Sequence, residues 1–494
     1  MVTTPAIISG FELSAEQFAA ILPLVILGAG ALLSMLIGLV RVNTKRPAQL
    51  VGVATLVAAF WSLYCSASTP AFEAFNGAIE ISGFTRTGMT LIFLSTLGIV
   101  IGSSRYLTRE KIHISDFYHL VLLSVFGASI MICARDLLSL FISLELMSLP
   151  IYTLVGFRRN DSRSNEASIK YFMVGAVIGA IFFLGSSLIF GATGSVQFVE
   201  IAKSLATLPP EQQQLFFAGL MLTIIAFLTK VASVPFQIWK PDVYEGAPVP
   251  VTGLMATVVT TASFFVLVKL CHLVDGTPFA GGVEKGLLVL AISSLVFGSF
   301  VVVTQTNVKR LLAYSSIANA GYMLLAVAGS FKNPDALSGL WMYLAAYATA
   351  NVGIFMLLSM TQVTADSGMD LVDFTGLIDR NPILVCFWSI FLFSLAGFPL
   401  TFGFIGKFVL FKEFLKGEAG IWVIFAVLCN VVSAYAYLRP IALMIMRDSD
   451  RSAGAWKGST ASILTVFVFA AMTVGFGIYP KHMIELLKRI PLFS

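Results

Sequence analysis

The stretch GLMLTIIAFLTKVASVPF, residues 219–236, decides how this sequence is to be interpreted. It is apolar enough to enter the hydrocarbon core of a membrane, yet it carries Lys230 and, five residues later, Pro235. A lysine near the centre of a membrane helix costs about 2.5–3.5 kcal/mol on insertion scales. Such a residue is kept for a function or a specific partner, so Lys230 is the first candidate site residue.

Similar apolar runs recur along the whole chain. Of 494 residues, 57% are hydrophobic and 12% are charged, whereas a soluble domain carries about 25% charged residues. Continuous apolar runs exclude alternating strands. We therefore expect an all-α polytopic membrane protein, one membrane domain over 1–494, with about fourteen transmembrane helices. They are expected near 17–40, 48–68, 86–104, 116–133, 137–157, 167–192, 214–236, 250–272, 285–304, 310–329, 338–362, 383–409, 419–445 and 460–479.

The distribution of charge bears on partners and on orientation. The basic residues lie in short loops, which favours the positive-inside rule over nucleic-acid binding. Loops after odd-numbered spans carry more Lys and Arg, with Lys240 among them, so both termini are expected on the outer side. Residues 1–15 contain no Lys or Arg, and no cleavable signal or transit peptide is expected. The tail 480–494 is amphipathic and too short to span.

The five cysteines and four histidines show no ligand spacing. The cysteines are scattered without a CxxC pair, and no two histidines share a helix face, so neither iron–sulfur nor haem ligation is predicted. We expect no cofactor and no metal in this chain.

Three further charges lie inside apolar runs. Glu145 lies in residues 136–155, Lys269 in TTASFFVLVKLCHL (260–273), and Lys407 in LAGFPLTFGFIGKFVLF (395–411). Lys269 and Lys407 have an alternative explanation, in which a lysine near a span end reaches the headgroups. A buried Glu–Lys pair that only joins helices is another alternative. Because burial makes a lysine release its proton more easily, such a pair can also handle protons.

Helix breakers accompany these charges. Pro150 follows Glu145, Pro235 follows Lys230, and Pro399 precedes Lys407. Backbone groups freed by proline are tolerated in a membrane only beside protein or a water-filled cavity. Breaks are therefore predicted at all three prolines, including in spans 7 and 12.

The two halves of the chain resemble each other weakly. Residues 227–239 and LFSLAGFPLTFGF (392–404) share an apolar, small, proline, polar order, and 136–152 resembles 310–323. This predicts two inverted five-helix repeats, spans 4–8 (about 116–272) and 9–13 (about 285–445), with an ion path between them.

These segments resemble the antiporter-like subunits of respiratory complex I, the proton-pumping NADH:quinone oxidoreductase, and of Mrp-type cation/proton antiporters. The strongest match is VPFQIWKPDVYEGAPVPVTGLMA (234–256), with SLELMSLPIY (143–152) and RLLAYSSIANAGYMLL (310–325) shared more widely. PDVYEGAP (241–248) is typical of one branch, whereas the branches called subunits L and M usually carry a PDAH-type sequence there.

The resemblance implies a role for each buried charge. Glu145 would pair with and tune Lys230, Lys269 would pass the proton towards the second half, and Lys407 would control exchange with the outer side. A hydrated path between Lys269 and Lys407 would use polar residues of spans 10 and 11, namely Tyr314, Ser315, Asn319, Tyr343, Tyr347 and Asn351.

The family also implies the surroundings. Flavin and iron–sulfur clusters would belong to partner subunits, and the neighbours would be the antiporter-like subunit M and the small K-, J- and A-type subunits in a bacterial inner membrane. The leading hypothesis is a proton-translocating subunit of complex I. The alternatives are an Mrp-type Na⁺/H⁺ antiporter or membrane-bound hydrogenase subunit, and a passive scaffold with fixed ion pairs.

Overall fold

The computed structural model describes residues 15–40, 45–361, 369–417, 420–447 and 458–488. They form helices and one small antiparallel hairpin, β1 (Phe72–Ala74) and β2 (Ile79–Ile81). The helices of the first half are α1 (Ala15–Val40), α2 (Lys45–Cys65), α3 (Gly83–Arg109), α4 (Ile114–Cys133), α5 (Leu137–Val155), α6 (Ser162–Thr193), α7 (Phe198–Ser204), α8 (Pro210–Val231), α9 (Trp239–Gly246), α10 (Val249–Leu254) and α11 (Thr260–His272), with a π-helical turn at Met255–Val259.

The second half is also helical. Its helices are α12 (Ala280–Thr304), α13 (Val308–Ser330), α14 (Ala336–Thr361), a 3-10 turn (Leu371–Phe374), α15 (Leu377–Arg380), α16 (Pro382–Ala396), α17 (Phe402–Leu415), α18 (Gly420–Met446), α19 (Thr460–Ile478) and α20 (Lys481–Lys488).

Thirteen described segments are long and apolar enough to cross a membrane. The expected span at 383–409 is instead split into α16, which alone is too short to cross, and α17. The all-α polytopic fold is thereby confirmed, and the two inverted repeats remain a prediction.

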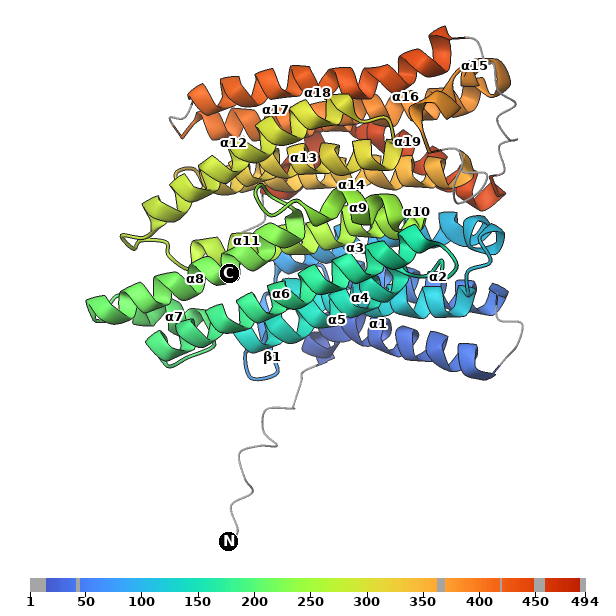
Figure 1. Cartoon of the computed structure of the whole chain (residues 1–494). Coiled ribbons are helices and arrows are strands. Elements are labelled where there is room, and N and C mark those ends of the chain that lie inside the picture. The colour runs from blue at the N-terminus through green and yellow to red at the C-terminus, as the bar shows by residue number, and fades with distance from the viewer. Residues whose placement is uncertain (1–14, 41–44, 362–368, 418–419, 448–457, 489–494) are drawn as a thin grey trace.

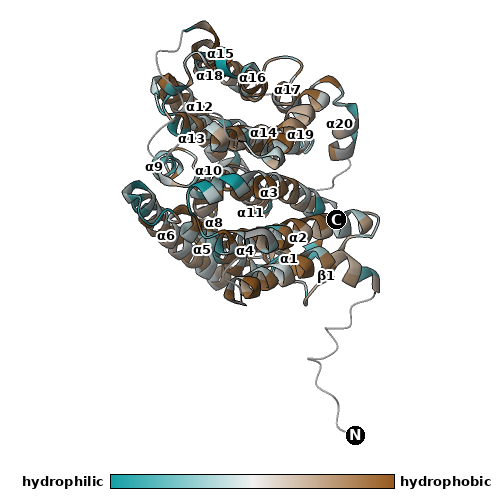
Figure 2. Ribbon diagram, turned by 90° about the vertical axis from the view of Figure 1, so that its right-hand side faces the viewer, coloured by the Kyte–Doolittle hydropathy of each residue, from teal (hydrophilic) through white to brown (hydrophobic). Residues whose placement is uncertain are grey.

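The two halves lie side by side with the most buried helices between them (Figure 1). In the most apolar stretch of the span Val249–His272, 100% of the residues are buried. The share is 94% in α13 and in α14, whereas it is 33% in α6 and in α18. The ribbon in Figure 2 is coloured as hydrophobic over much of the outer helices. Because those helices expose large apolar residues such as Phe172 and Ile424, their outer face fits lipid and not water.

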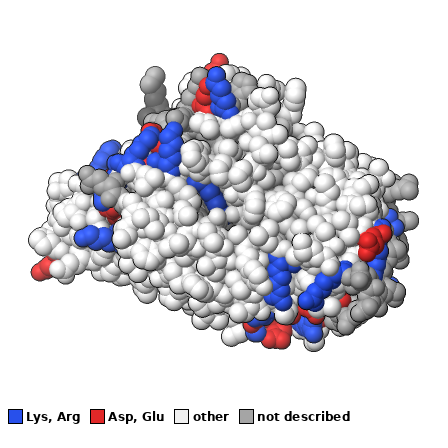
Figure 3. Space-filling model, turned by 90° about the horizontal axis from the view of Figure 1, so that it is seen from above, with Lys and Arg blue, Asp and Glu red and all other residues white. Residues whose placement is uncertain are grey.

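Charged side chains gather mainly towards the two ends of the helices on the face seen in Figure 3, with a broad uncharged band between them. This is the pattern expected when headgroups and water lie at the ends and hydrocarbon lies in the middle.

Two expectations need correction. The break predicted at Pro150 is wrong, because α5 continues through it from Leu137 to Val155. Gly127 of α4 packs so closely that a Cβ there would lie 2.4 Å from the Met147 nitrogen, so neighbouring protein covers the weakened turn. Lys240 is also not a loop residue; it lies in α9, buried.

Some predictions fall on residues outside the described ranges. They include the loop residues Arg41, Arg451 and Lys457 used for orientation, the span limits near 362 and 419, and the last part of the tail, 489–494. The outer placement of both termini therefore stays a prediction.

Candidate functional site: lysines at two broken helices

Lys230 lies in the last turn of α8 and is buried. Its Nζ donates hydrogen bonds to Ser148 Oγ at 2.9 Å and to Tyr152 Oη at 3.0 Å, both on α5. The rings of Tyr152 and Tyr171 lie 5.2 and 5.6 Å from Nζ, close enough for cation–π attraction. The ammonium group is thus held by neutral hydroxyl partners, and no ion pair joins it to a carboxylate among the described residues.

Glu145 lies on α5, three residues before Ser148 and seven before Tyr152, so helical periodicity places all three on one face. It is half-buried, and Lys230 is the charge that acts on its carboxyl group. A Cβ at Gly179 of α6 would lie 2.9 Å from Glu145 Oε1, so a glycine is needed there to leave room for the carboxylate. The pairing of Glu145 with Lys230 stays a prediction, because the hydrogen bonds of Lys230 go to Ser148 and Tyr152.

The helix is broken directly after Lys230. Ala232 adopts a left-handed backbone, φ 59° and ψ 45°, and α9 begins only at Trp239, beyond Pro235. The Val231 carbonyl at the break accepts a hydrogen bond from Lys240 Nζ at 3.4 Å. The predicted break in span 7 is therefore present.

The second break has the same plan. α16 ends at Ala396, Gly397 has φ 83°, and after Pro399 the Thr401 side chain caps α17 by accepting from Phe404 N. Lys407 of α17 is buried and donates to Leu395 O at 2.8 Å and to Asn430 Oδ1. Its Nζ lies 4.9 Å from the Tyr322 ring and 5.9 Å from the Tyr343 ring. Lys407 therefore does not reach the headgroups.

A buried polar cluster lies beside Lys407. Tyr343 Oη donates to Asn319 Oδ1 at 2.6 Å, and Asn319 Nδ2 donates to Ser315 Oγ at 3.3 Å. Ser315 is also hydrogen-bonded to Tyr437, and Tyr347 Oη donates to Ser316 Oγ at 2.7 Å. Hydroxyls and amides in contact can pass hydrogen bonds along a chain, so the cluster has the chemistry of a proton path.

The other two predicted path residues lie differently. Asn351 Nδ2 donates to its own helix, to Tyr347 O at 2.8 Å, and the half-buried Tyr314 packs its ring 6.2 Å from that of Phe297. Their contacts are those of packing residues.

Lys269 belongs to α11 and is buried, with its side chain against the end of α4. Its Nζ donates to Ile132 O at 2.5 Å and Ala134 O at 3.0 Å, and lies 5.7 Å from the Phe84 ring. These carbonyls are left without helical partners where α4 ends, so Lys269 acts as a helix cap. The contacts favour neither headgroup contact nor the predicted bridging position.

Two buried lysines were missed from the sequence. Lys240 and Lys309 lie between the expected spans, so the sequence predicts loop positions, whereas both are buried. Lys309 Nζ donates to Glu245 O at 2.7 Å and Ala247 O at 2.6 Å, which ties the end of α9 to α13. The sequence carries little signal of this burial, because α9 (WKPDVYEG) is itself rich in charged residues.

A charged cluster around Asp242 anchors α9. Asp242 accepts from Lys170 at 2.8 Å and from Arg310 at 2.9 Å. Partial burial favours the protonated acid, but these hydrogen bonds outweigh it and hold the pKa of Asp242 below its usual value.

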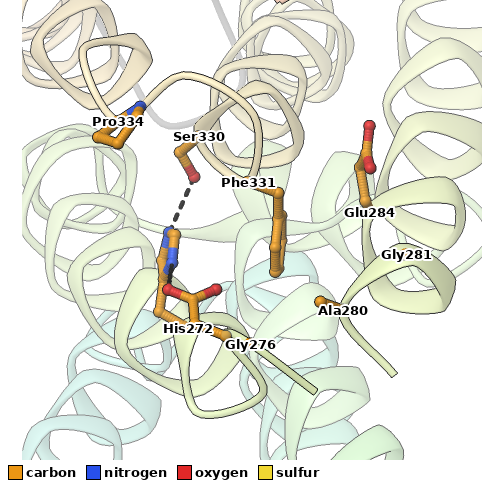
Figure 4. A pocket seen from close by; sticks show the side chains of 9 residues that line it. His272, Gly276, Ala280, Gly281, Glu284, Ser330, Phe331 and Pro334 are labelled. Carbon is orange, nitrogen blue, oxygen red and sulfur yellow. Dashed lines mark hydrogen bonds and ion pairs between the residues drawn. The ribbon is translucent and has the colours of Figure 1, made fainter. Parts of the chain in front are cut away.

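A pocket of about 540 Å³ lies where α11, α12 and α13 meet. Its His272 is hydrogen-bonded to Asp275 at 2.6 Å and to Ser330 at 2.9 Å, as Figure 4 shows for Ser330. The ring of Phe331 stacks on the imidazole. Glu284 in the same pocket pairs with Lys332. The polar groups of this pocket therefore join the ends of neighbouring helices. Among the described residues, no group of three or more His, Cys, Asp and Glu could hold a metal ion.

A bundle with two broken helices, buried lysines and a central polar cluster defines an antiporter-like membrane protein. Residues 134–433 match the family model described as NADH:quinone oxidoreductase/Mrp antiporter, transmembrane, and the chain belongs to this family. It is 34% identical to NADH-quinone oxidoreductase subunit N 1 of Chloroherpeton thalassium, over 97% of this chain and 99% of that protein.

Other comparisons agree. The chain is 36% identical to NADH-quinone oxidoreductase subunit N of Desulfovibrio desulfuricans, over 83% of this chain and 84% of that protein. It superimposes on a chain of respiratory complex I from Thermus thermophilus with a TM-score of 0.80 and 29% identity, covering 94% of this chain and 99% of that one. The branch indicated by PDVYEGAP in the sequence is therefore that of subunit N.

Proposed function

We propose that this chain is a proton-translocating membrane-arm subunit of an NADH:quinone oxidoreductase, driven by electron transfer in other subunits. The observation that carries the proposal is the pair of broken helices, each with a buried lysine at its break. The polar cluster of α13 and α14 supports it, because it lies between the broken helices. The names of the relatives support the same assignment.

The mechanism is electrostatic. Glu145 and Lys230 interact through protein, where two unit charges several ångströms apart interact by roughly 2–3 kcal/mol at an effective dielectric constant near 20. That energy changes proton affinity by more than tenfold. A change of charge at Glu145 therefore makes Lys230 hold or release its proton, and the proton moves on towards Lys407.

The surroundings follow from the same proposal. Spans within 116–272 and 285–445 form two half-channels, and both termini lie on the outer side of a bacterial inner membrane. Flavin and iron–sulfur clusters belong to partner subunits, and the adjacent subunits are of the M, K, J and A types. The chain contributes a proton path to the enzyme complex and no redox group.

The test is Lys230→Met in the complex purified and reconstituted into vesicles, with Lys412→Met as control. Lys412 lies on α17 and is exposed. We expect Lys230→Met to assemble but to lose proton translocation by about tenfold or more, because a positioned proton carrier contributes at least that much. The control should pump normally.

Two outcomes would contradict the proposal. Normal pumping by assembled Lys230→Met would leave only a passive scaffold. Copurification with Mrp-type subunits, and without flavin or iron–sulfur proteins, would assign the chain to a cation/proton antiporter.

A further inference from the structure

Lys240 is a buried lysine whose role the proposed function leaves open. It is the second residue of α9, and 1% of its surface is exposed. No ion pair within 4.0 Å joins it to a carboxylate in the part of the chain that the structure describes. Its Nζ makes one long hydrogen bond, 3.4 Å to Val231 O, and lies 5.4 Å from the Tyr244 ring.

Capping alone explains this lysine poorly. A hydrogen bond of 3.4 Å is weak, and the positive end of the α9 dipole opposes a cation at its first turn. Removing an ammonium group from water without a counter-ion costs several kcal/mol. Lys309, by contrast, caps α9 with two bonds of 2.6 and 2.7 Å.

Lys240 has Lys230 on one side. Val231, whose carbonyl it contacts, directly follows Lys230 in the chain. The Tyr171 ring lies 5.6 Å from Lys230 Nζ and stacks on Trp239, the neighbour of Lys240, with ring centres 4.8 Å apart. The two lysines thus flank one break, and stacked aromatic rings connect Lys230 to the residue that precedes Lys240.

On the other side of Lys240 lie polar groups that lead towards the second half of the chain. The buried Tyr244 hydroxyl has Ser316 and Tyr347 as its near electrostatic neighbours, and within the described residues it makes no hydrogen bond of ordinary length. Tyr347 in turn donates to Ser316. A buried hydroxyl without a fixed partner is free to take part in a transient chain of hydrogen bonds.

We propose that Lys240 carries the proton between Lys230 and the Tyr244–Ser316–Tyr347 group that leads towards Lys407. This rests on the proposed function and gives Lys240 the bridging position that the sequence had suggested for Lys269. The Lys230 ammonium transfers one proton to the neutral Lys240 amine, through water or a hydroxyl. Lys230 is left neutral, Lys240 becomes the cation, and the proton then leaves along the hydroxyl groups.

Lys407 supports this assignment by its geometry. Lys240 and Lys407 both follow a break, both donate back to a carbonyl in the last residues of the preceding half-helix, and both lie over a tyrosine ring. The difference is that Lys407 has a second hydrogen-bond acceptor in Asn430. Lys240 is therefore less firmly held, as suits an intermediate carrier.

The test compares Lys240→Gln and Lys240→Arg in the reconstituted complex, with Lys230→Met as reference and the exposed Lys412→Gln as control. Glutamine keeps a donor for the Val231 carbonyl but no titrating group, and arginine keeps the charge but does not release its proton. We expect both Lys240 variants to assemble and to pump as poorly as Lys230→Met.

The outcomes separate the two proposals. Normal pumping by either Lys240 variant, with pumping lost in Lys230→Met, would overturn the role of Lys240 and leave the proposed function intact. Normal pumping by Lys230→Met would instead overturn the proposed function. If Lys240→Gln fails to assemble, the pumping of Lys240→Arg alone decides between the two roles. If Lys240 only caps the Val231 carbonyl with a cation, arginine should replace it and pumping should be normal.

Discussion

Spans 7 and 12 are both interrupted near a proline, and the first half of each ends with a residue in the left-handed backbone region. Ala232 occupies this position in span 7 and Gly397 in span 12. In both, a lysine beyond the break donates to a carbonyl of the preceding half-helix. The shared plan satisfies backbone groups that a membrane would otherwise leave unpaired.

The differences between the two breaks are instructive. Span 7 has a lysine on each side of its break, Lys230 and Lys240, and the charge of Glu145 acts on the first. Beside its break, span 12 has one buried lysine, Lys407, whose Nζ donates to the Asn430 amide oxygen. A break with two lysines suits transfer of a proton onwards, whereas a break with one suits an end point. The remaining predictions test this contrast.

The largest effect is expected from Gly175→Ala, which acts on the first break alone. A Cβ at this position of α6 would lie 1.9 Å from the Tyr152 hydroxyl that binds Lys230. The ring must move, so we expect a stability loss of about 1–3 kcal/mol and pumping reduced towards that of Lys230→Met. Pumping and thermal unfolding of the complex would be measured together.

Gly191→Ala is the matched control, because it lies on the same helix and its Cβ would meet only Leu215, at 3.9 Å. Unchanged pumping in Gly175→Ala would mean that the Tyr152 contact is dispensable.

An intermediate effect is expected from exchanging the residues at the two breaks. Gly397→Ala should destabilise by about 1–2 kcal/mol, because left-handed backbone disfavours a side chain, and Ala232→Gly should lower that same strain. The alanine Cβ at 397 would also lie 3.2 Å from Lys407 Cδ, so pumping should fall as well. Thermal unfolding of the two purified complexes should show a lower unfolding temperature for Gly397→Ala and a higher one for Ala232→Gly. Shifts of the same sign in both variants would contradict the shared plan of the two breaks.

The smallest effect is expected from pH at the anchor of α9. The pKa of Asp242 is lower in the folded protein than in the unfolded chain, where it is about 3.9. Its stabilising effect is therefore fully present above that value and is lost as the pH falls through the lower, folded pKa. Asp242→Asn should remove this dependence with little effect on stability at pH 7, since the group is exposed to water on one side.

Unfolding temperatures of the two proteins from pH 7 down to pH 3 would check this. The difference between the two unfolding temperatures should shrink towards the acid end of this range. A difference that stays constant from pH 7 to pH 3 would exclude Asp242 as the anchor.

Much of the fold and part of the site could be predicted from the sequence. The apolar runs alone determined the all-α membrane fold, because only a helix satisfies its backbone within a lipid-facing segment. The burial of Lys230 and Lys407 followed from the same runs, whereas Glu145, predicted to be buried as well, is half-buried. Pro235 and Pro399 marked the two breaks correctly.

The tertiary structure alone decided the rest. Pro150 leaves α5 intact because α4 packs against the turn, and Lys269 caps α4 through carbonyls more than a hundred residues away. Lys240 looks like a loop residue beside Asp242, yet it is buried because α9 folds back against α13. The length of an apolar run is a local property of the chain, so the sequence by itself determined the membrane helices. The partner of a buried charge depends on which distant helices pack together, so only the tertiary structure decided it.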